Sequence, residues 1–195
     1  QLQPGTTFTL GINDAQGTGK STLADLIQRV LTVRYGRNVA MLSLDDFYLT
    51  RIERRELANT VHPLLITRGV PGTHDTGLLR DCLTGLSRLA AGETMSLPRF
   101  DKAVDDRADE STWPRIEGPV DLIILEGWCV GAAAVDNESL ADPINELELV
   151  EDPAELWRSY ANERLREDYE PVFAMLDALV FLQAPGFYAV LEWRL

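Results

Sequence analysis

Near its beginning the chain carries Asp14-Ala15-Gln16-Gly17-Thr18-Gly19-Lys20-Ser21-Thr22. This stretch follows a short apolar run, Phe8–Ile12, and precedes apolar residues at helical spacing, so we expect it to join a strand to a helix. Glycines in such a turn let successive backbone N–H groups point inward around an anion, and the helix adds free N–H groups and the positive end of its dipole. The pattern therefore predicts a phosphate-binding P-loop.

The positions of this loop have distinct expected roles. Lys20 can reach the β- and γ-phosphates of a nucleotide, and the hydroxyl of Ser21 can ligate Mg²⁺. Asp14 stands where the usual pattern begins with glycine, and we expect its carboxylate to face away from the phosphates. The alternative is a helix-capping turn that binds nothing. The residues expected to bind ATP are Gln16, Gly17, Thr18, Gly19, Lys20, Ser21 and Thr22.

The composition is that of an ordinary globular protein. We expect residues 1–195 to form a single domain, because 195 residues suffice for a core. The net charge of −13, without a Lys/Arg-rich stripe, argues against a nucleic-acid partner. No apolar run approaches transmembrane length, which argues against a membrane partner. Two distant cysteines, Cys82 and Cys129, and no signal peptide predict reduced thiols in a cytoplasmic protein. The composition leaves the oligomeric state open.

Apolar runs alternate with helical patterns along the chain. Continuously apolar strands separated by helices predict a parallel sheet covered on both faces, which is an α/β fold. Residues 49–75 and 94–119 are polar and expected to be mostly loop. The expected strands are 8–12, 39–44, 120–125 and 178–183. The expected helices follow the P-loop up to Gly36, begin after a capping Asp75, begin at Asp152-Pro153 and begin at Phe187.

Acidic residues follow two of the predicted strands. Ligands of parallel sheets bind at the carboxyl ends of the strands, so the P-loop, Asp45 and Glu126 are expected to meet there. A carboxylate at Asp45 can accept the proton of an acceptor hydroxyl, and Asp46 competes for this role. Glu126 can hold Mg²⁺ directly or through water. The alternative for each acid is a turn at the end of a strand.

Other polar residues are weaker candidates. Four cations can pair with an anionic substrate, although each alone is more often a surface residue: Arg68, Arg99, Arg107 and Lys102. His74 is either a site residue or an exposed side chain that precedes the helix cap.

These residues resemble a known group of enzymes. Gln16–Thr22 and Ser43–Leu49 are similar to the P-loop kinases that include uridine kinase, phosphoribulokinase and pantothenate kinase. Further segments are similar to the D-glycerate 3-kinase branch. They are Arg68–Asp75, Leu97–Lys102, Asp106–Asp109, Ser111–Pro114, Leu125–Trp128 and Glu192–Arg194.

The resemblance implies a three-layer P-loop kinase sandwich and transfer of the ATP γ-phosphate to the 3-hydroxyl of D-glycerate. It implies ATP and Mg²⁺ as cofactors, Lys20 and Asp45 as catalytic residues, and Ser21 and Glu126 as metal-shell residues. A lid and a last strand are expected after Leu195. The residues implied to face the substrate are Asp45, Tyr48, Arg68, His74, Asp75 and Arg99.

Two other functions remain open from the sequence. The acceptor could be a nucleoside, pantothenate or another sugar acid. The protein could also bind a nucleotide as a regulator without transferring phosphate, although an Asn-Lys-x-Asp guanine-reading motif is not found in the sequence.

Overall fold

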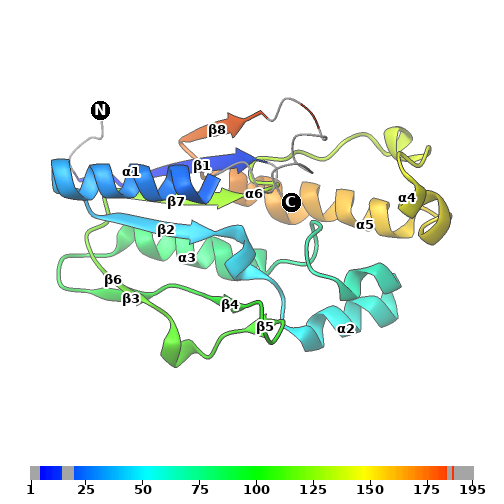
Figure 1. Cartoon of the computed structure of the whole chain (residues 1–195), viewed down its shortest axis with the longest axis horizontal. Coiled ribbons are helices and arrows are strands. Elements are labelled where there is room, and N and C mark those ends of the chain that lie inside the picture. The colour runs from blue at the N-terminus through cyan, green and yellow to red at the C-terminus, as the bar shows by residue number, and fades with distance from the viewer. Residues whose placement is uncertain (1–4, 15–19, 184–185, 187–195) are drawn as a thin grey trace.

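A parallel sheet forms the centre of the molecule (Figure 1). The computed structural model describes residues 5–14, 20–183 and 186. The sheet has four strands in the order β2-β7-β1-β8, and every neighbouring pair is parallel. This order confirms the predicted α/β class. The strands are β1 (Phe8–Asp14), β2 (Val39–Ser43), β7 (Leu122–Gly127) and β8 (Ala178–Leu182).

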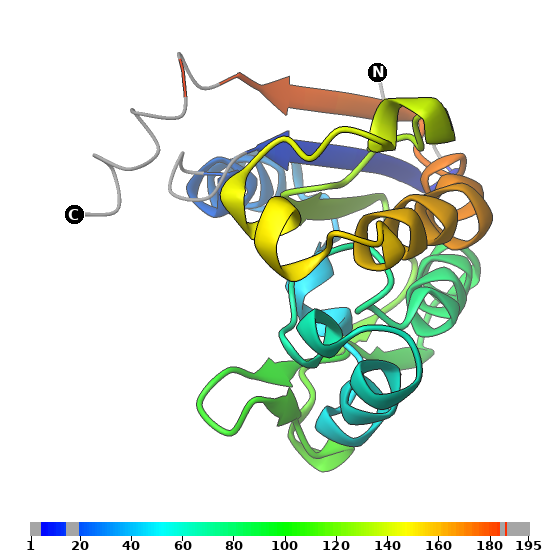
Figure 2. The same ribbon diagram turned by 90° about the vertical axis from the view of Figure 1, so that its right-hand side faces the viewer.

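Helices cover both faces of this sheet (Figure 2). Helix α1 (Lys20–Tyr35) packs on one face through Ala24, and Gly36 follows it with φ +62°. Helix α3 (Thr76–Arg88) covers the other face, together with a continuous helical stretch. That stretch consists of α5 (Leu156–Arg164), a π-helical turn (Leu165–Tyr169) and α6 (Glu170–Phe173). The three-layer prediction is confirmed.

Strand β7 shows why the sheet needs both layers. All six of its residues are buried. Because successive side chains alternate between the faces of a strand, Leu122 and Ile124 join the cluster under α1, whereas Ile123 and Leu125 join the cluster under α3. The strand is therefore apolar throughout, as is typical of a central parallel strand.

The expectation of mostly loop between residues 49 and 75 is wrong. Helix α2 (Arg51–Thr60) lies there, and Arg54 is its one buried residue, so no apolar stripe marks it. Thr50 and Glu53 form a capping box at its start. The region 94–119 also contains two antiparallel pairs, β3 (Thr94–Ser96) with β6 (Arg115–Glu117), and β4 (Phe100–Asp101) with β5 (Asp106–Arg107).

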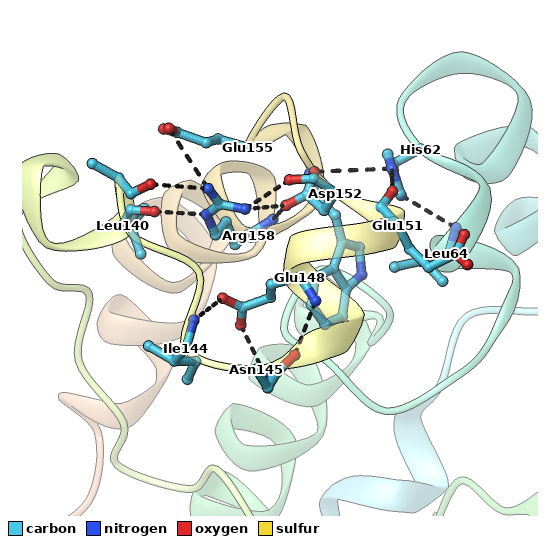
Figure 3. A network of polar contacts seen from close by, with 12 residues as sticks. His62, Leu64, Leu140, Ile144, Asn145, Glu148, Glu151, Asp152, Glu155 and Arg158 are labelled. Carbon is cyan, nitrogen blue, oxygen red and sulfur yellow. Dashed lines mark hydrogen bonds and ion pairs between the residues drawn. The ribbon is translucent and has the colours of Figure 1, made fainter.

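The helix expected to start at Asp152 begins three residues after Pro153, at Leu156. Asp152 instead ends the short helix α4 (Glu146–Glu151), which was not predicted. Its carboxylate still accepts the backbone N–H groups of Trp157 and Arg158, and it pairs with the Arg158 guanidinium at 3.2 Å (Figure 3). Asp152 therefore caps the first turn of α5, although it lies outside that helix.

Within the described ranges, no helix is both long and apolar enough to span a lipid bilayer. The helix predicted to begin at Phe187 lies outside the described residues.

Candidate active site

The predicted acids gather at the carboxyl edge of the sheet. Asp45 and Asp46 lie in a 3₁₀ turn (Leu44–Phe47) that directly follows β2. Glu126 is paired in register with Ser43 of β2 and with Ile12 of β1. Within the P-loop segment, residues 15–19 lie outside the described part of the chain, and Lys20 is the first residue of α1. The acids that follow β2 and end β7 thus lie at the same edge of the sheet.

Part of the predicted nucleotide site cannot be placed. Gln16, Gly17, Thr18 and Gly19 lie outside the described residues, as do the side chains of Asp14, Lys20 and Ser21. Lys20, Ser21 and Thr22 form the first turn of α1, and the Thr22 side chain is exposed. Their expected contacts with phosphate remain predictions.

Asp45 presents a carboxylate with two partners. The Tyr48 hydroxyl donates to Oδ1 at 3.1 Å, and Lys102 Nζ donates to Oδ2 at 2.7 Å. Burial acts to raise the pKa of Asp45, but the hydrogen bond and charge of Lys102 outweigh it and hold that pKa below its ordinary value. Burial and the Asp45 charge raise the pKa of Tyr48, so its hydroxyl stays protonated and donates. Asp45 is therefore ionised at neutral pH.

The carboxylate of Asp46 has different partners from that of Asp45. Its carboxylate accepts the Phe100 backbone N–H at 3.2 Å and pairs with Arg99 at 3.1 Å. Burial raises the pKa of Asp46 despite the Arg99 charge. A 3₁₀ helix turns by about 120° per residue, so adjacent acids in this turn face different surroundings. Asp46 and Arg99 thus fasten the β4–β5 hairpin to the end of β2.

A pocket of about 510 Å³ opens beside Asp45. Two arginines on its wall, Arg54 and Arg68, both pair with Asp105. Arg54 is only 1% exposed and also donates to three backbone carbonyls, so Arg68 and Lys102 are the accessible cations. Arg99 is not among the residues that line this pocket. The lining residues are Asp45, Tyr48, Arg54, Ile66, Thr67, Arg68, Gly69, Lys102 and Asp105.

The neighbouring residues His74 and Asp75 have different structural roles. Asp75 caps α3 by accepting the Leu78 N–H, as the sequence predicted, and it pairs with Arg107 at 2.9 Å. The alternative of an exposed His74 is wrong, because this residue is 4% exposed. Its ring stacks on the ring of Tyr48 with 4.4 Å between centroids. His74 therefore lies directly behind a residue of the pocket wall.

Glu126 fits the role of a metal-shell acid. It is 7% exposed, and its buried Oε2 has no hydrogen-bond partner among the described residues. A buried carboxylate oxygen without a donor fits a cation or a cation-bound water. The described ranges contain no cluster of three or more His, Cys, Asp or Glu side chains suited to a metal. Mg²⁺ does not need one, because it binds through one or two carboxylates together with phosphates and water.

Known proteins resemble this chain in sequence and in fold. An uncharacterized kinase, mug58, from Schizosaccharomyces pombe is 37% identical over 98% of this chain and 70% of its own length. The structure of a D-glycerate 3-kinase from Cryptococcus neoformans superposes with a TM-score of 0.83 and 30% identity, covering 97% of this chain and 68% of that one. The chain belongs to the D-glycerate 3-kinase branch of the P-loop kinases. The chloroplastic D-glycerate 3-kinase of Arabidopsis thaliana is 33% identical over 96% of this chain, which spans 40% of that protein. No protein-family model matches.

Sequence reasoning missed several polar residues of this P-loop kinase. From the sequence, Lys102 is only a weak candidate for an anionic substrate, and its pairing with Asp45 is not predicted, although the segment Leu97–Lys102 carries the resemblance to the branch. Asp105 has φ +56° and pairs with Arg54 and Arg68, and no pattern in the neighbouring sequence predicts these ion pairs. Tyr169 reaches His74 from the other end of the chain, so only the fold could reveal it.

Proposed function

We propose that this kinase transfers the γ-phosphate of ATP to a hydroxyl group of a small hydroxy acid, and that D-glycerate is the acceptor, giving 3-phosphoglycerate. The observation that carries the proposal is the ionised Asp45 carboxylate beside a pocket whose accessible cations are Arg68 and Lys102. The relatives named D-glycerate 3-kinase support this choice of acceptor.

The charges of the pocket suit one small carboxylate. Its wall holds three cations, Arg54, Arg68 and Lys102, against two acids, Asp45 and Asp105. An acceptor with a single negative charge balances that excess. A guanidinium can hold a carboxylate with two parallel hydrogen bonds, and such a clamp on Arg68 would fix the direction of the acceptor hydroxyl. Arg68 is 30% exposed, so it can serve both Asp105 and a ligand.

Asp45 is proposed to orient the hydroxyl and take its proton. The hydroxyl oxygen forms a bond to the γ-phosphorus, the bond from that phosphorus to ADP breaks, and the proton passes to Asp45. A carboxylate with a lowered pKa accepts a proton only when the new bond is largely formed, which fits the loose transition state of phosphoryl transfer. The Tyr48 hydroxyl holds Oδ1 of Asp45 in place meanwhile.

The nucleotide is proposed to bind residues 16–22, with Lys20 toward the β- and γ-phosphates. Ser21 and Glu126 would hold Mg²⁺. When bound, Mg²⁺ neutralises charge on the phosphoryl group being transferred. The unpartnered Oε2 of Glu126 supports this assignment.

The test compares Asp45→Asn with Asp46→Asn in steady-state kinetics with MgATP and D-glycerate. Loss of the base is expected to lower kcat by about 10²- to 10⁴-fold in Asp45→Asn with little change in the KM for ATP. Asp46→Asn makes the same chemical change one residue away, outside the pocket lining, and is expected to retain most of kcat. Near-normal turnover of Asp45→Asn would refute the assignment of the base.

An acceptor screen tests the substrate separately. ADP release is measured with D-glycerate, other sugar acids, pantothenate and uridine. An acceptor without a carboxylate that outperforms D-glycerate would contradict the proposed pocket chemistry. ADP release that does not depend on any acceptor would contradict phosphate transfer altogether.

A further inference from the structure

Asp105 is an acid on the wall of the pocket beside Asp45, in the connection between β4 and β5. Its backbone has φ +56°, which lies in the left-handed region that few residues other than glycine adopt. This conformation costs free energy and persists where surrounding contacts hold it, often at ligand sites. The contacts that hold Asp105 are made with two arginines, Arg54 and Arg68.

Arg54 fixes both the backbone and the side chain of Asp105. Its Nη2 donates to the Asp105 carbonyl at 2.6 Å and lies 3.0 Å from Oδ2 of the carboxylate. Its Nε and Nη1 donate to the carbonyls of Leu49 and Ile66. Because Arg54 is buried and each of its nitrogens has a partner, it serves as a support for Asp105 and offers no nitrogen to a ligand.

Arg68 contacts the other oxygen of Asp105 through one nitrogen. Its Nη1 donates to Oδ1, whereas its Nε and Nη2 have no hydrogen-bond partner among the residues that the structure describes. The Cζ atom of Arg68 lies 5.5 Å from the centroid of the Phe100 ring, and this contact also restricts the guanidinium. One edge of Arg68, formed by Nε and Nη2, thus stays available, and such an edge can hold one carboxylate.

Asp105 also sets the charge of the pocket. Burial acts to raise its pKa, but the hydrogen bonds and charges of Arg54 and Arg68 outweigh burial and hold that pKa below its ordinary value. Asp105 is therefore ionised at neutral pH. The pocket lining holds three cations and, with Asp105, two acids, so one positive charge is in excess. Without this carboxylate the excess would be two.

We infer that Asp105 is a specificity-determining residue that limits the acceptor to a single negative charge. This inference rests on the proposed function. Asp105 occupies Nη1 of Arg68 and leaves one edge for the carboxylate of a hydroxy acid, while its own charge disfavours a second anionic group on the acceptor. Removal of that charge is therefore expected to shift the preference of the pocket toward dianions.

A series of three small compounds tests the charge preference. Glycerol, D-glycerate and tartronate share a three-carbon skeleton with a central hydroxyl, and they carry no, one and two carboxylates. Isothermal titration calorimetry with MgADP present measures the affinity of each compound for the wild type and for Asp105→Asn. We expect the ratio of tartronate affinity to D-glycerate affinity to rise by about 10- to 100-fold in the variant, the effect of one unit charge near a protein surface. Glycerol binding should not change.

Two further variants separate charge from backbone conformation. Asn adopts positive φ nearly as readily as Asp, whereas Glu keeps the charge but adopts positive φ less readily. Asp105→Glu is therefore expected to keep the preference for D-glycerate. A purely structural role would instead make Asp105→Glu the more harmful change.

Asp101→Asn is the matched control. Asp101 lies in the same hairpin but outside the pocket lining, and its exposed carboxylate accepts the Ala103 N–H at 2.8 Å. An Asn oxygen can accept the same hydrogen bond, so this variant loses only a charge. Because exposed charges are screened by salt, the affinity ratio is expected to stay within about threefold of the wild-type value.

An unchanged affinity ratio in Asp105→Asn, or an equal rise in Asp101→Asn, would overturn the inference. Tighter binding of D-glycerate with an unchanged ratio would also overturn it, because Asp105 would then only compete with the acceptor for Arg68. The proposed function fails by a different result, a wild-type protein that phosphorylates none of the hydroxy acids. The tartronate measurement needs no phosphate transfer, so it would still show whether Asp105 sets the charge of the anion that this pocket binds.

Discussion

Acidification from pH 8 to pH 5 is expected to weaken the folded state through His74. The imidazole is sealed between Tyr48 and Tyr169, and burial lowers its pKa from the ordinary 6.5 to about 3. The unfolded chain therefore takes up a proton as the pH falls below 6.5, whereas the folded chain does not. Stability from this residue is complete above pH 6.5 and is lost progressively as the pH falls toward 3.

The magnitude follows from the distance between the two pKa values. Each pH unit below 6.5 lowers the free energy of unfolding by about 1.4 kcal/mol, until the pH is low enough for the folded form also to bind the proton. At pH 5 the loss is about 2 kcal/mol, a substantial share of the 5–15 kcal/mol that is typical of a folded domain.

Urea unfolding at pH 8 and pH 5 measures this loss in the wild type and in His74→Gln. The free energy of unfolding falls between pH 8 and pH 5, and this fall should be smaller by about 2 kcal/mol in the variant, because Gln does not titrate. The other ionisable groups are the same in both proteins, so their contributions cancel in the comparison. His62→Gln is the matched control, since it removes the other histidine and keeps His74. An identical pH dependence in the wild type and His74→Gln would show that His74 is accessible to protons, and the argument from its enclosure would be refuted.

Two further substitutions probe the packing and the ion pairs of the fold. Gly72→Ala is expected to lower the free energy of unfolding by about 2–4 kcal/mol, because this glycine has φ +93° and an added Cβ would lie 2.5 Å from a ring carbon of Tyr160. Gly36→Ala is its control, with φ +62° and open space, and equal costs in thermal unfolding would disprove the steric part. Arg158→Met is expected to cost about 3–5 kcal/mol, because it leaves a buried carboxylate without its cation. Arg80→Met breaks an exposed pair and should cost less than about 1 kcal/mol by the same measurement; a similar loss in both would contradict the role of burial.

The sheet could be predicted because its strands carry their own signal. Continuous apolar runs mark all four strands, and the helices α1 and α3 show apolar spacing on one face. Helix α2 has no such spacing, because Arg54 is its one buried residue, and helix α4 is only six residues long. The start of α5 was misplaced because the carboxylate of Asp152 caps it through space from the end of the preceding helix.

For the site, the sequence predicts which acids follow the strands, but it does not predict the side chains that these acids contact. The pair Asp45-Asp46 was a strong candidate, but the choice between them depends on contacts with Lys102 and Arg99 more than 50 residues later. The burial of His74 depends on Tyr169, which lies 95 residues away in the sequence. Neighbour patterns do not encode such contacts, so these features require the fold.

The adjacent acids Asp45 and Asp46, in the turn after β2, bind the β4–β5 hairpin at two points. Asp46 anchors it at Phe100, and Asp45 holds it through Lys102 two residues farther on. Inserting a single residue ahead of this dipeptide would rotate both carboxylates by about 120° and release both anchors at once. The length of that short connection is therefore as tightly constrained as the identity of its acids, and a deletion or insertion there would disable the protein even with every polar side chain retained.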